Sequence, residues 1–249
     1  AMILSMAHLG ERAFDSIGGA VVSTTAFVIE NAHSLNHEGT FIRLVDGSSE
    51  AEKERQLKEA IQKKESDWFY RASAEDFEKI PGSPIAYWVS DSTRHAFGVG
   101  EPFRGVGFPK VGMQTSNNEK YLRLWHEISI DTFAFSSNEN PIWIKYIKGG
   151  PFRRWYGNLD YLLHFNGSSG HILSQKNATV LPLENLLLPK GTWTDLTSGK
   201  FNARFAPTDS FHDISGHCFY PEKDDLNWLL GYANSPNFNA FLSIVNSSF

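Results

Sequence analysis

The 249-residue sequence is poor in cysteine and has no long apolar run. Its single cysteine, Cys218, cannot form an internal disulfide framework, and it excludes a multi-cysteine zinc or iron–sulfur site. No apolar stretch approaches the roughly 20 residues that a membrane helix needs. No leader peptide can be read at the N-terminus. We therefore expect a cytoplasmic protein with no membrane partner and no bound metal.

The sequence also lacks a strong excess of either charge, because its 28 acidic residues only modestly outnumber its 23 basic ones. An acidic net charge argues against a nucleic-acid partner, since phosphates are bound by Lys and Arg. The distribution is uneven, however. Residues 101–205 contain 12 basic and 8 acidic side chains, whereas residues 1–100 contain 10 and 15. A basic middle segment in a chain with 14% aromatic residues is compatible with a local nucleic-acid surface.

Local patterns predict a mixed α/β fold. Strands are expected at residues 3–9, 21–30 and 41–45, with 41–45 as the antiparallel partner of 21–30. A surface helix should begin at Ser49, because Ser49 and Glu52 form a capping-box pattern. Residues 66–112 are rich in Pro and Gly and predict a connecting region. Short strands are expected at 121–130, 160–165, 192–196 and 201–205, followed by helices at 226–233 and after Ser235-Pro236.

Two polar stretches of the middle segment could bind a ligand. Residues 141–160 hold five aromatic and four basic side chains around Gly149-Gly150. Cations neutralise phosphates, and aromatic rings stack on bases; a core strand with a basic rim would have the same composition. The loop at residues 114–118 could donate to base edges or phosphates, or it could be a solvated turn.

Seven stretches that follow one another along the chain resemble a known family. They are MAHLGERAFDSIGGAVVSTTAFVIEN, FIRLVDG, IPGSPIAYWVS, GMQTSNNEKYLRLWHE, IKGGPFRRWYGN, TWTDLTSGKFNARF and LNWLLGYANSPNFNAFLSIVN. In this order they resemble the large adenine-specific DNA methyltransferases of phage defence. These are the PglX-like enzymes of BREX systems and their type II restriction-modification relatives. The resemblance runs from about residue 4 to about residue 245.

The resemblance implies a fold and a function for each segment. Residues 2–47 would be the C-terminal strands of a Rossmann-like methyltransferase sheet, 48–110 a helical and irregular bridge, and 111–249 an α+β target-recognition domain. The chain would recognise double-stranded DNA for an S-adenosylmethionine-dependent N6-adenine methyltransferase. The cofactor site and the catalytic Asn-Pro-Pro-aromatic motif would lie outside it, because Asn140-Pro141-Ile142-Trp143 lacks the second proline. The chain alone is therefore expected to be inactive.

The resemblance also assigns roles to single residues. Phe27 would stack on the adenine that is flipped out of the helix. In GMQTSNNEKYLR, Ser116-Asn117 replaces the Gly-Asp pair that is common in the family. DNA contacts are expected from three groups. They are Thr115, Asn117, Asn118 and Arg123; Lys148, Arg153, Arg154, Trp155 and Tyr156; and, for phosphate positioning, Thr192, Thr194, Ser198, Lys200 and Arg204.

Two other function classes remain open from the sequence. The aromatic residues could anchor a protein interface, so that the chain docks another protein of the defence system. A carbohydrate-binding or hydrolase-like domain is suggested only by the Trp and Tyr content, and no convincing pair of catalytic carboxylates supports it. Loss of DNA affinity on substitution of Arg153 and Arg154 would separate DNA recognition from both.

Overall fold

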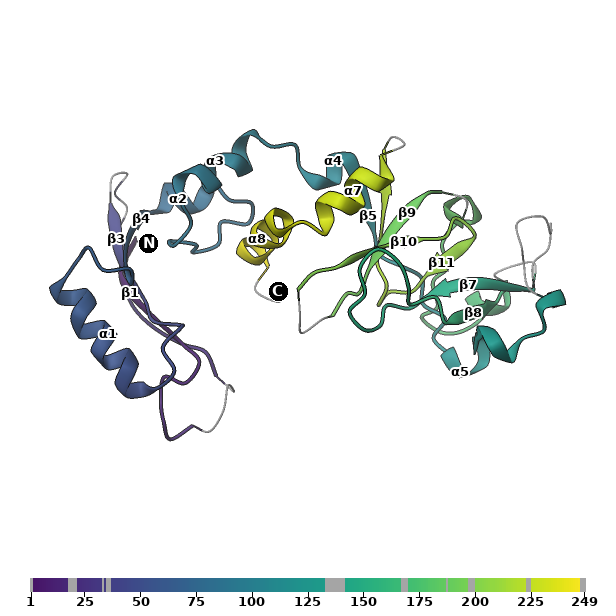
Figure 1. The fold of residues 1–249 in the computed structure, drawn as a ribbon, viewed down its shortest axis with the longest axis horizontal. Helices are drawn as coiled ribbons and strands as arrows, with labels where there is room; N and C mark the ends of the chain where they lie inside the picture. Colours follow the sequence, from purple (N-terminus) through teal and green to yellow (C-terminus); the bar gives the residue numbers. More distant parts are fainter. Residues whose placement is uncertain are drawn as a thin grey trace. The chain divides into compact units, whose positions relative to one another are not determined.

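The computed structural model describes residues 2–17, 22–32, 34, 37–132, 142–166, 170–186, 188–196, 200–222 and 225–246. The chain forms two compact units, residues 1–100 and 101–249. Helices and strands occur together in both units (Figure 1), so the predicted mixed α/β class is confirmed. The division between the units falls within the segment 48–110, which the sequence predicted to be a bridge.

The first unit is built on a four-stranded sheet. Its elements are β1 (Met2–Gly10), β2 (Thr24–Glu30), β3 (Glu38–Arg43), α1 (Glu50–Gln62), β4 (Phe69–Ser73), α2 (Ala74–Glu78) and α3 (Asp91–Val99). The strand order is β2-β1-β3-β4. β1 runs antiparallel to β2 and parallel to β3, and β3 is antiparallel to β4.

This strand order corrects one prediction. Residues 41–45 were expected to pair with residues 21–30, but β1 lies between β2 and β3. The physical reason is burial: every residue of β1 is at least partly buried, whereas six of the seven residues of β2 are exposed. The better-buried strand therefore takes the inner position. The structure also adds β4, which the sequence did not predict.

Helix α1 covers one face of this sheet (Figure 1). It begins as predicted at Ser49, whose hydroxyl accepts a hydrogen bond from the amide of Glu52 at 3.3 Å. Its Ala60 packs on Ile42 of β3 and on Leu44, which follows that strand. The helix also buries Lys53, whose ammonium donates to the carbonyl oxygens of Leu44 at 2.6 Å and Leu9 at 2.7 Å.

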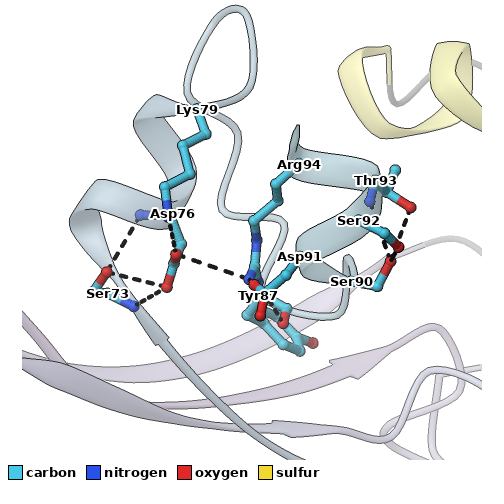
Figure 2. Close-up of polar contacts among 9 residues, drawn as sticks. All are labelled: Ser73, Asp76, Lys79, Tyr87, Ser90, Asp91, Ser92, Thr93 and Arg94. Atoms are coloured by element: carbon cyan, nitrogen blue, oxygen red, sulfur yellow. Dashed lines mark hydrogen bonds and ion pairs between the residues drawn. The ribbon is translucent and has the colours of Figure 1, made fainter. Parts of the chain in front are cut away.

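A polar network joins α2 and α3 (Figure 2). The Asp76 carboxylate accepts from the amide of Ser73 at 3.0 Å and from the ammonium of Lys79 at 2.9 Å. The buried Arg94 guanidinium lies 3.8 Å from that carboxylate and donates to Asp91 at 2.7 Å. Partial burial alone would raise the pKa of Asp76, but these donors and cations lower the pKa to about 2.

The second unit contains two four-stranded sheets. Its strands are β5 (Gly107–Lys110), β6 (Leu122–Leu124), β7 (Trp143–Ile147), β8 (Tyr161–His164), β9 (Lys190–Trp193), β10 (Ala203–Ala206), β11 (Ser210–His212) and β12 (Cys218–Pro221). Its helices are α4 (Phe103–Val106), α5 (Asn118–Tyr121), α6 (Gly170–Leu173), α7 (Leu226–Ala233) and α8 (Pro236–Val245), with 3-10 turns at Trp125–Glu127, Ile130–Thr132 and Leu183–Leu186. The sheet orders are β10-β9-β12-β5 and β11-β7-β8-β6.

Each sheet has its own hydrophobic core. Ile144, Leu163 and Phe211 lie in the core of the β11-β7-β8-β6 sheet. Helix α7 packs Leu229 and Leu230 on the other sheet, in one core with Phe219 of β12. Both C-terminal helices are confirmed, and Ser235 caps α8 as predicted. No helix among the described residues is long and apolar enough to cross a bilayer.

The predicted strand at residues 121–130 is wrong for most of its length. Only Leu122–Leu124 pairs with β8, and a 3-10 turn follows at Trp125–Glu127. Two hydrogen bonds lie at this change from strand to turn. The Glu127 carboxylate accepts from the amide of Leu124 at 2.7 Å, and the Trp125 amide donates to the carbonyl of Asp160 at 2.9 Å.

Candidate functional site

The candidate site is the connection between β7 and β8, residues 149–158, which we call the basic-aromatic loop. Its backbone is sharply folded, because five of its residues have a positive φ. These are Gly149 (56°), Gly150 (127°), Trp155 (72°), Gly157 (125°) and Asn158 (58°). The two glycine angles above 120° lie where other residues are strongly disfavoured. The loop therefore has a defined conformation.

Main-chain hydrogen bonds fix this loop to the edge of a sheet. The amide of Trp155 donates to the carbonyl of Ala203 at 3.1 Å, and the amide of Phe205 donates to the carbonyl of Trp155 at 2.8 Å. Together they form a short parallel bridge with β10. Since β10 is the outer strand of its sheet, the loop occupies a strand edge that would otherwise lack partners.

A buried arginine on strand β10 forms hydrogen bonds that support the loop. Arg204 of β10 has no exposed surface. Its guanidinium donates to the side-chain oxygen of Asn202 at 2.8 Å, to Thr194 Oγ1 at 3.3 Å and to the carbonyl of Arg153 at 3.5 Å. Thr194 in turn donates to the carbonyl of Gly150 at 3.1 Å. Burial lowers the pKa of the Arg204 guanidinium, and no carboxylate among the described residues forms an ion pair with it.

The side chains at the tip of the loop point into solvent. Phe152 and Trp155 are each 54% exposed and Tyr156 is 64% exposed. Arg153 and Arg154 are exposed as well, and the Arg154 guanidinium lies 5.5 Å from the centre of the Phe152 ring. The alternative interpretation of this stretch as a core strand therefore fails for residues 152–156. The loop presents two cations among three aromatic rings on a fixed backbone.

Other expected contact residues are buried and hold neighbouring loops. The hydroxyl of Thr115 donates to the side-chain oxygen of Asn118 at 2.7 Å, and that of Thr192 donates to the carbonyl of His217 at 2.8 Å. Neither Thr115, Thr192 nor Arg204 offers an atom to a ligand at the surface. Lys200 is exposed, Lys148 and Thr194 are half-buried, and Ser198 lies outside the described residues.

Within the polar loop at residues 114–118, Asn117 and Asn118 lie at the other end of β8 from the basic-aromatic loop. Leu122 lies opposite Leu163 and Leu124 opposite Tyr161, so Asn117 and Asn118 lie beyond the far end of β8. Asn117 caps α5 by accepting from the amide of Lys120 at 3.0 Å. The exposed Arg123 donates to the main-chain carbonyls of Glu119 and Leu122.

The sequence did not identify one exposed aromatic residue, Trp125, at the end of β8 where the basic-aromatic loop enters. Trp125 is 59% exposed, and its amide is bonded to Asp160, four residues after Tyr156. The sequence pattern placed Trp125 inside a longer strand and so gave no reason to single it out. The hydrogen-bonded register of β6 and β8 brings it next to Asp160, two residues after the basic-aromatic loop.

In the first unit, Phe27 lies on the exposed strand β2. It pairs in register with Met6 and is 60% exposed, so it is not a buried core residue. Its neighbours Val28 and Ile29 are 54% and 51% exposed. Within the described parts of the chain, no group of His, Cys, Asp and Glu side chains could hold a metal ion.

No family model matches the chain. It is 35% identical, over 98% of its length, to the adenine-specific methyltransferase PglX of Lacticaseibacillus casei (strain Zhang). It is 34% identical, over 97% of its length, to the adenine-specific methyltransferase BrxX of Escherichia coli O9:H4 (strain HS). The resemblance to the adenine-specific methyltransferases of BREX phage defence is confirmed. The chain spans 22% and 20% of the lengths of these two BREX methyltransferases.

Nearly the whole chain takes part in this similarity to BREX methyltransferases. Both candidate surfaces, Phe27 on β2 and the basic-aromatic loop, therefore belong to the segment that is shared with them. The similarity does not by itself assign a role to either surface.

Proposed function

We propose that residues 101–249 recognise the DNA target of an S-adenosylmethionine-dependent N6-adenine methyltransferase of the BREX type. The observation that carries this proposal is the basic-aromatic loop, whose exposed Arg153 and Arg154 are flanked by exposed rings on a fixed backbone. Guanidinium groups bind phosphate oxygens in a bidentate geometry, and aromatic rings stack on bases. Both chemistries meet at one surface.

The rigidity of the loop favours binding. Ordering a flexible loop on association costs free energy, and a loop already held in place avoids that cost. The bridge from Trp155 to β10 and the support by Arg204 supply this order before DNA arrives. We assign direct contacts to the loop tip and Lys200, and additional contacts to Lys148, Thr194 and Arg123. The buried Arg204 positions the loop, and the buried Thr115 and Thr192 hold neighbouring segments.

Phe27 has a different part in the proposal. An N6-adenine methyltransferase must reach an amino group inside the duplex, so the adenine is extruded and its unstacking is offset by new stacking contacts. An exposed phenylalanine on a strand, with Met6 beside it, offers a flat apolar surface for this purpose. In the parent enzyme Phe27 would form one wall of the base pocket.

The methyl donor would bind outside this chain. A hollow of about 300 Å³ in the first unit is lined by apolar residues such as Phe41 and Phe77 and by the carboxylates of Glu75 and Glu78. It has no glycine-rich turn between a strand and a helix, which is the arrangement that commonly binds a nucleotide-like cofactor. These residues do not fit S-adenosylmethionine. The sequence also has no Asn-Pro-Pro-aromatic run, so the chain alone should not methylate DNA.

The test is a titration of the chain with duplex DNA at about 50 and about 200 mM salt. Arg153→Ala/Arg154→Ala removes two phosphate contacts, which should make the negative slope of log K against log salt shallower by about 2. The variant should therefore lose about tenfold less affinity between the two salt concentrations than the unaltered chain.

The control is Lys58→Ala/Lys63→Ala on α1. These lysines are 68% and 72% exposed, and their removal changes the net charge by the same amount. We expect this control to bind DNA like the unaltered chain. Equal affinity and equal salt dependence in all three proteins would contradict DNA recognition by the basic-aromatic loop.

One observation favours a second candidate function, the docking of a protein partner. Trp228 on α7 is 59% exposed and stacks on Tyr232, with ring centres 5.6 Å apart and planes within 9°. Exposed aromatic residues of this kind anchor protein interfaces. Under this alternative, Trp228→Ala would weaken the binding of the chain to another protein of the defence system. Arg153→Ala/Arg154→Ala would leave DNA affinity unchanged.

A further inference from the structure

Trp155 has an unusual backbone conformation for its residue type. Its φ of 72° lies in the left-handed region, where a bulky side chain crowds the main chain and costs free energy. Both polar groups of its backbone are used, the amide on Ala203 and the carbonyl on Phe205. The strained conformation is therefore held in place from both sides.

Packing of the indole does not compensate for this strain. The Trp155 side chain is 54% exposed, and no ring among the described residues stacks against it. A glycine would adopt the same backbone conformation without crowding. The residue type at this position is therefore not explained by the stability of the fold, and a strained, exposed side chain points to a role in binding.

We propose that Trp155 is a stacking wedge that inserts its indole between neighbouring bases of the bound duplex. The inference rests on the proposed function, since it requires DNA at the basic-aromatic loop. Charge complementarity selects DNA as the occupant: Arg153 and Arg154 directly precede the indole and would hold phosphates beside the opened step. Apolar side chains that enter a duplex in this way unstack a base step and kink the helix.

A fixed wedge makes a prediction that needs no knowledge of the target sequence. Insertion between bases costs unstacking energy, and this cost is smallest where the bases are already mispaired. A duplex with one central mismatch should therefore bind more tightly than the same duplex fully paired. Contacts with phosphates alone are present in both duplexes and produce no such preference.

The experiment compares the affinity of the chain for these two duplexes, with Trp155→Gly as the main variant. We expect the unaltered chain to prefer the mismatched duplex by about tenfold. Trp155→Gly should abolish the preference without lowering the melting temperature, because glycine tolerates this φ. Trp155→Phe should keep part of the preference. Trp228→Ala, which removes a similarly exposed indole from α7, is the control and should keep all of the preference.

The outcomes separate this inference from the proposed function. Salt-dependent DNA binding with the same ratio of affinities in the unaltered chain and Trp155→Gly would overturn the wedge and leave DNA recognition standing. The absence of binding to either duplex at low salt would overturn the proposed function and the wedge with it. A lower melting temperature for Trp155→Gly would show that the indole stabilises the fold, which also contradicts the inference.

Discussion

Gly157→Ala tests whether the conformation of the basic-aromatic loop is the one that binds DNA. Gly157 has a φ of 125°, and a Cβ added there would lie 2.6 Å from Cδ of Arg153. Strain in this backbone region costs about 1–3 kcal/mol. The Arg153 side chain is flexible and exposed, so it can move away, but it then leaves its position at the loop tip. The loop can also relieve the strain by breaking its bridge to β10.

Both responses remove the prepared binding surface, so DNA affinity should fall. If a strain of about 1–3 kcal/mol shifts the loop out of its binding conformation, the affinity for DNA falls by about 5- to 150-fold. Gly82→Ala is the matched control, because Gly82 also has a positive φ of 83° and a Cβ there would meet no atom within 4 Å. It should lower the stability of the first unit and leave DNA binding unchanged. Unchanged DNA affinity in Gly157→Ala, together with a lowered melting temperature, would refute the assignment of this loop conformation to binding.

Two further substitutions test the fold of each unit. The pKa of Asp76 is about 2 in the folded chain and 3.8 in the unfolded chain. This shift adds about 2 kcal/mol to the free energy of unfolding at neutral pH. Because the folded value is the lower one, this stabilisation is complete above pH 3.8 and is lost as the pH falls through about 2; urea unfolding of Asp76→Asn should show a deficit of about 2 kcal/mol at pH 7 that shrinks towards pH 2. Gly191→Ala places a Cβ against the ring of Phe219, its partner across the β9–β12 pair, in a packed core. The melting temperature of the second unit should therefore fall by an amount equivalent to about 1–3 kcal/mol, and an unchanged value would contradict the pairing of β9 with β12.

Elements whose determinants are local in the sequence could be predicted. The caps at Ser49 and Ser235 lie within three residues of the amides that they bond, so the starts of α1 and α8 follow from short motifs. The i,i+4 ion pair between Glu54 and Lys58 is likewise present in the structure.

Strand partners could not be predicted in the same way. The pairing of β3 with β1 and β4 depends on which strand is best buried, and this is decided by residues far apart in the chain. The pairing of β6 with β8 similarly brings Trp125 to Asp160, a contact across 35 positions that no local pattern reveals.

The candidate site shows the same division. The composition of residues 141–160 identified the basic-aromatic loop, because alternating cations and rings are visible in the sequence. The orientation of β10 was not visible. Its register against β9 buries Arg204 and leaves Phe205 37% exposed, the reverse of what polarity alone predicts. A charged residue in a strand of four positions can face either side, and here the carbonyl of Arg153 and the side chain of Asn202 supply the partners that make burial possible.

This burial changes what the charge count of the chain means. Lys53, Lys190 and Arg204 are all buried and donate to main-chain carbonyls, so none of them can contact a phosphate at the surface. The excess of basic residues in the segment 101–205 is therefore a poor measure of its affinity for DNA, as is the net charge of −5 for the whole chain. What decides binding is the placement of a few exposed cations on a fixed backbone. For this reason the loss of Arg153 and Arg154 should weaken DNA binding far more than the loss of two exposed cations outside the proposed surface, such as Lys58 and Lys63.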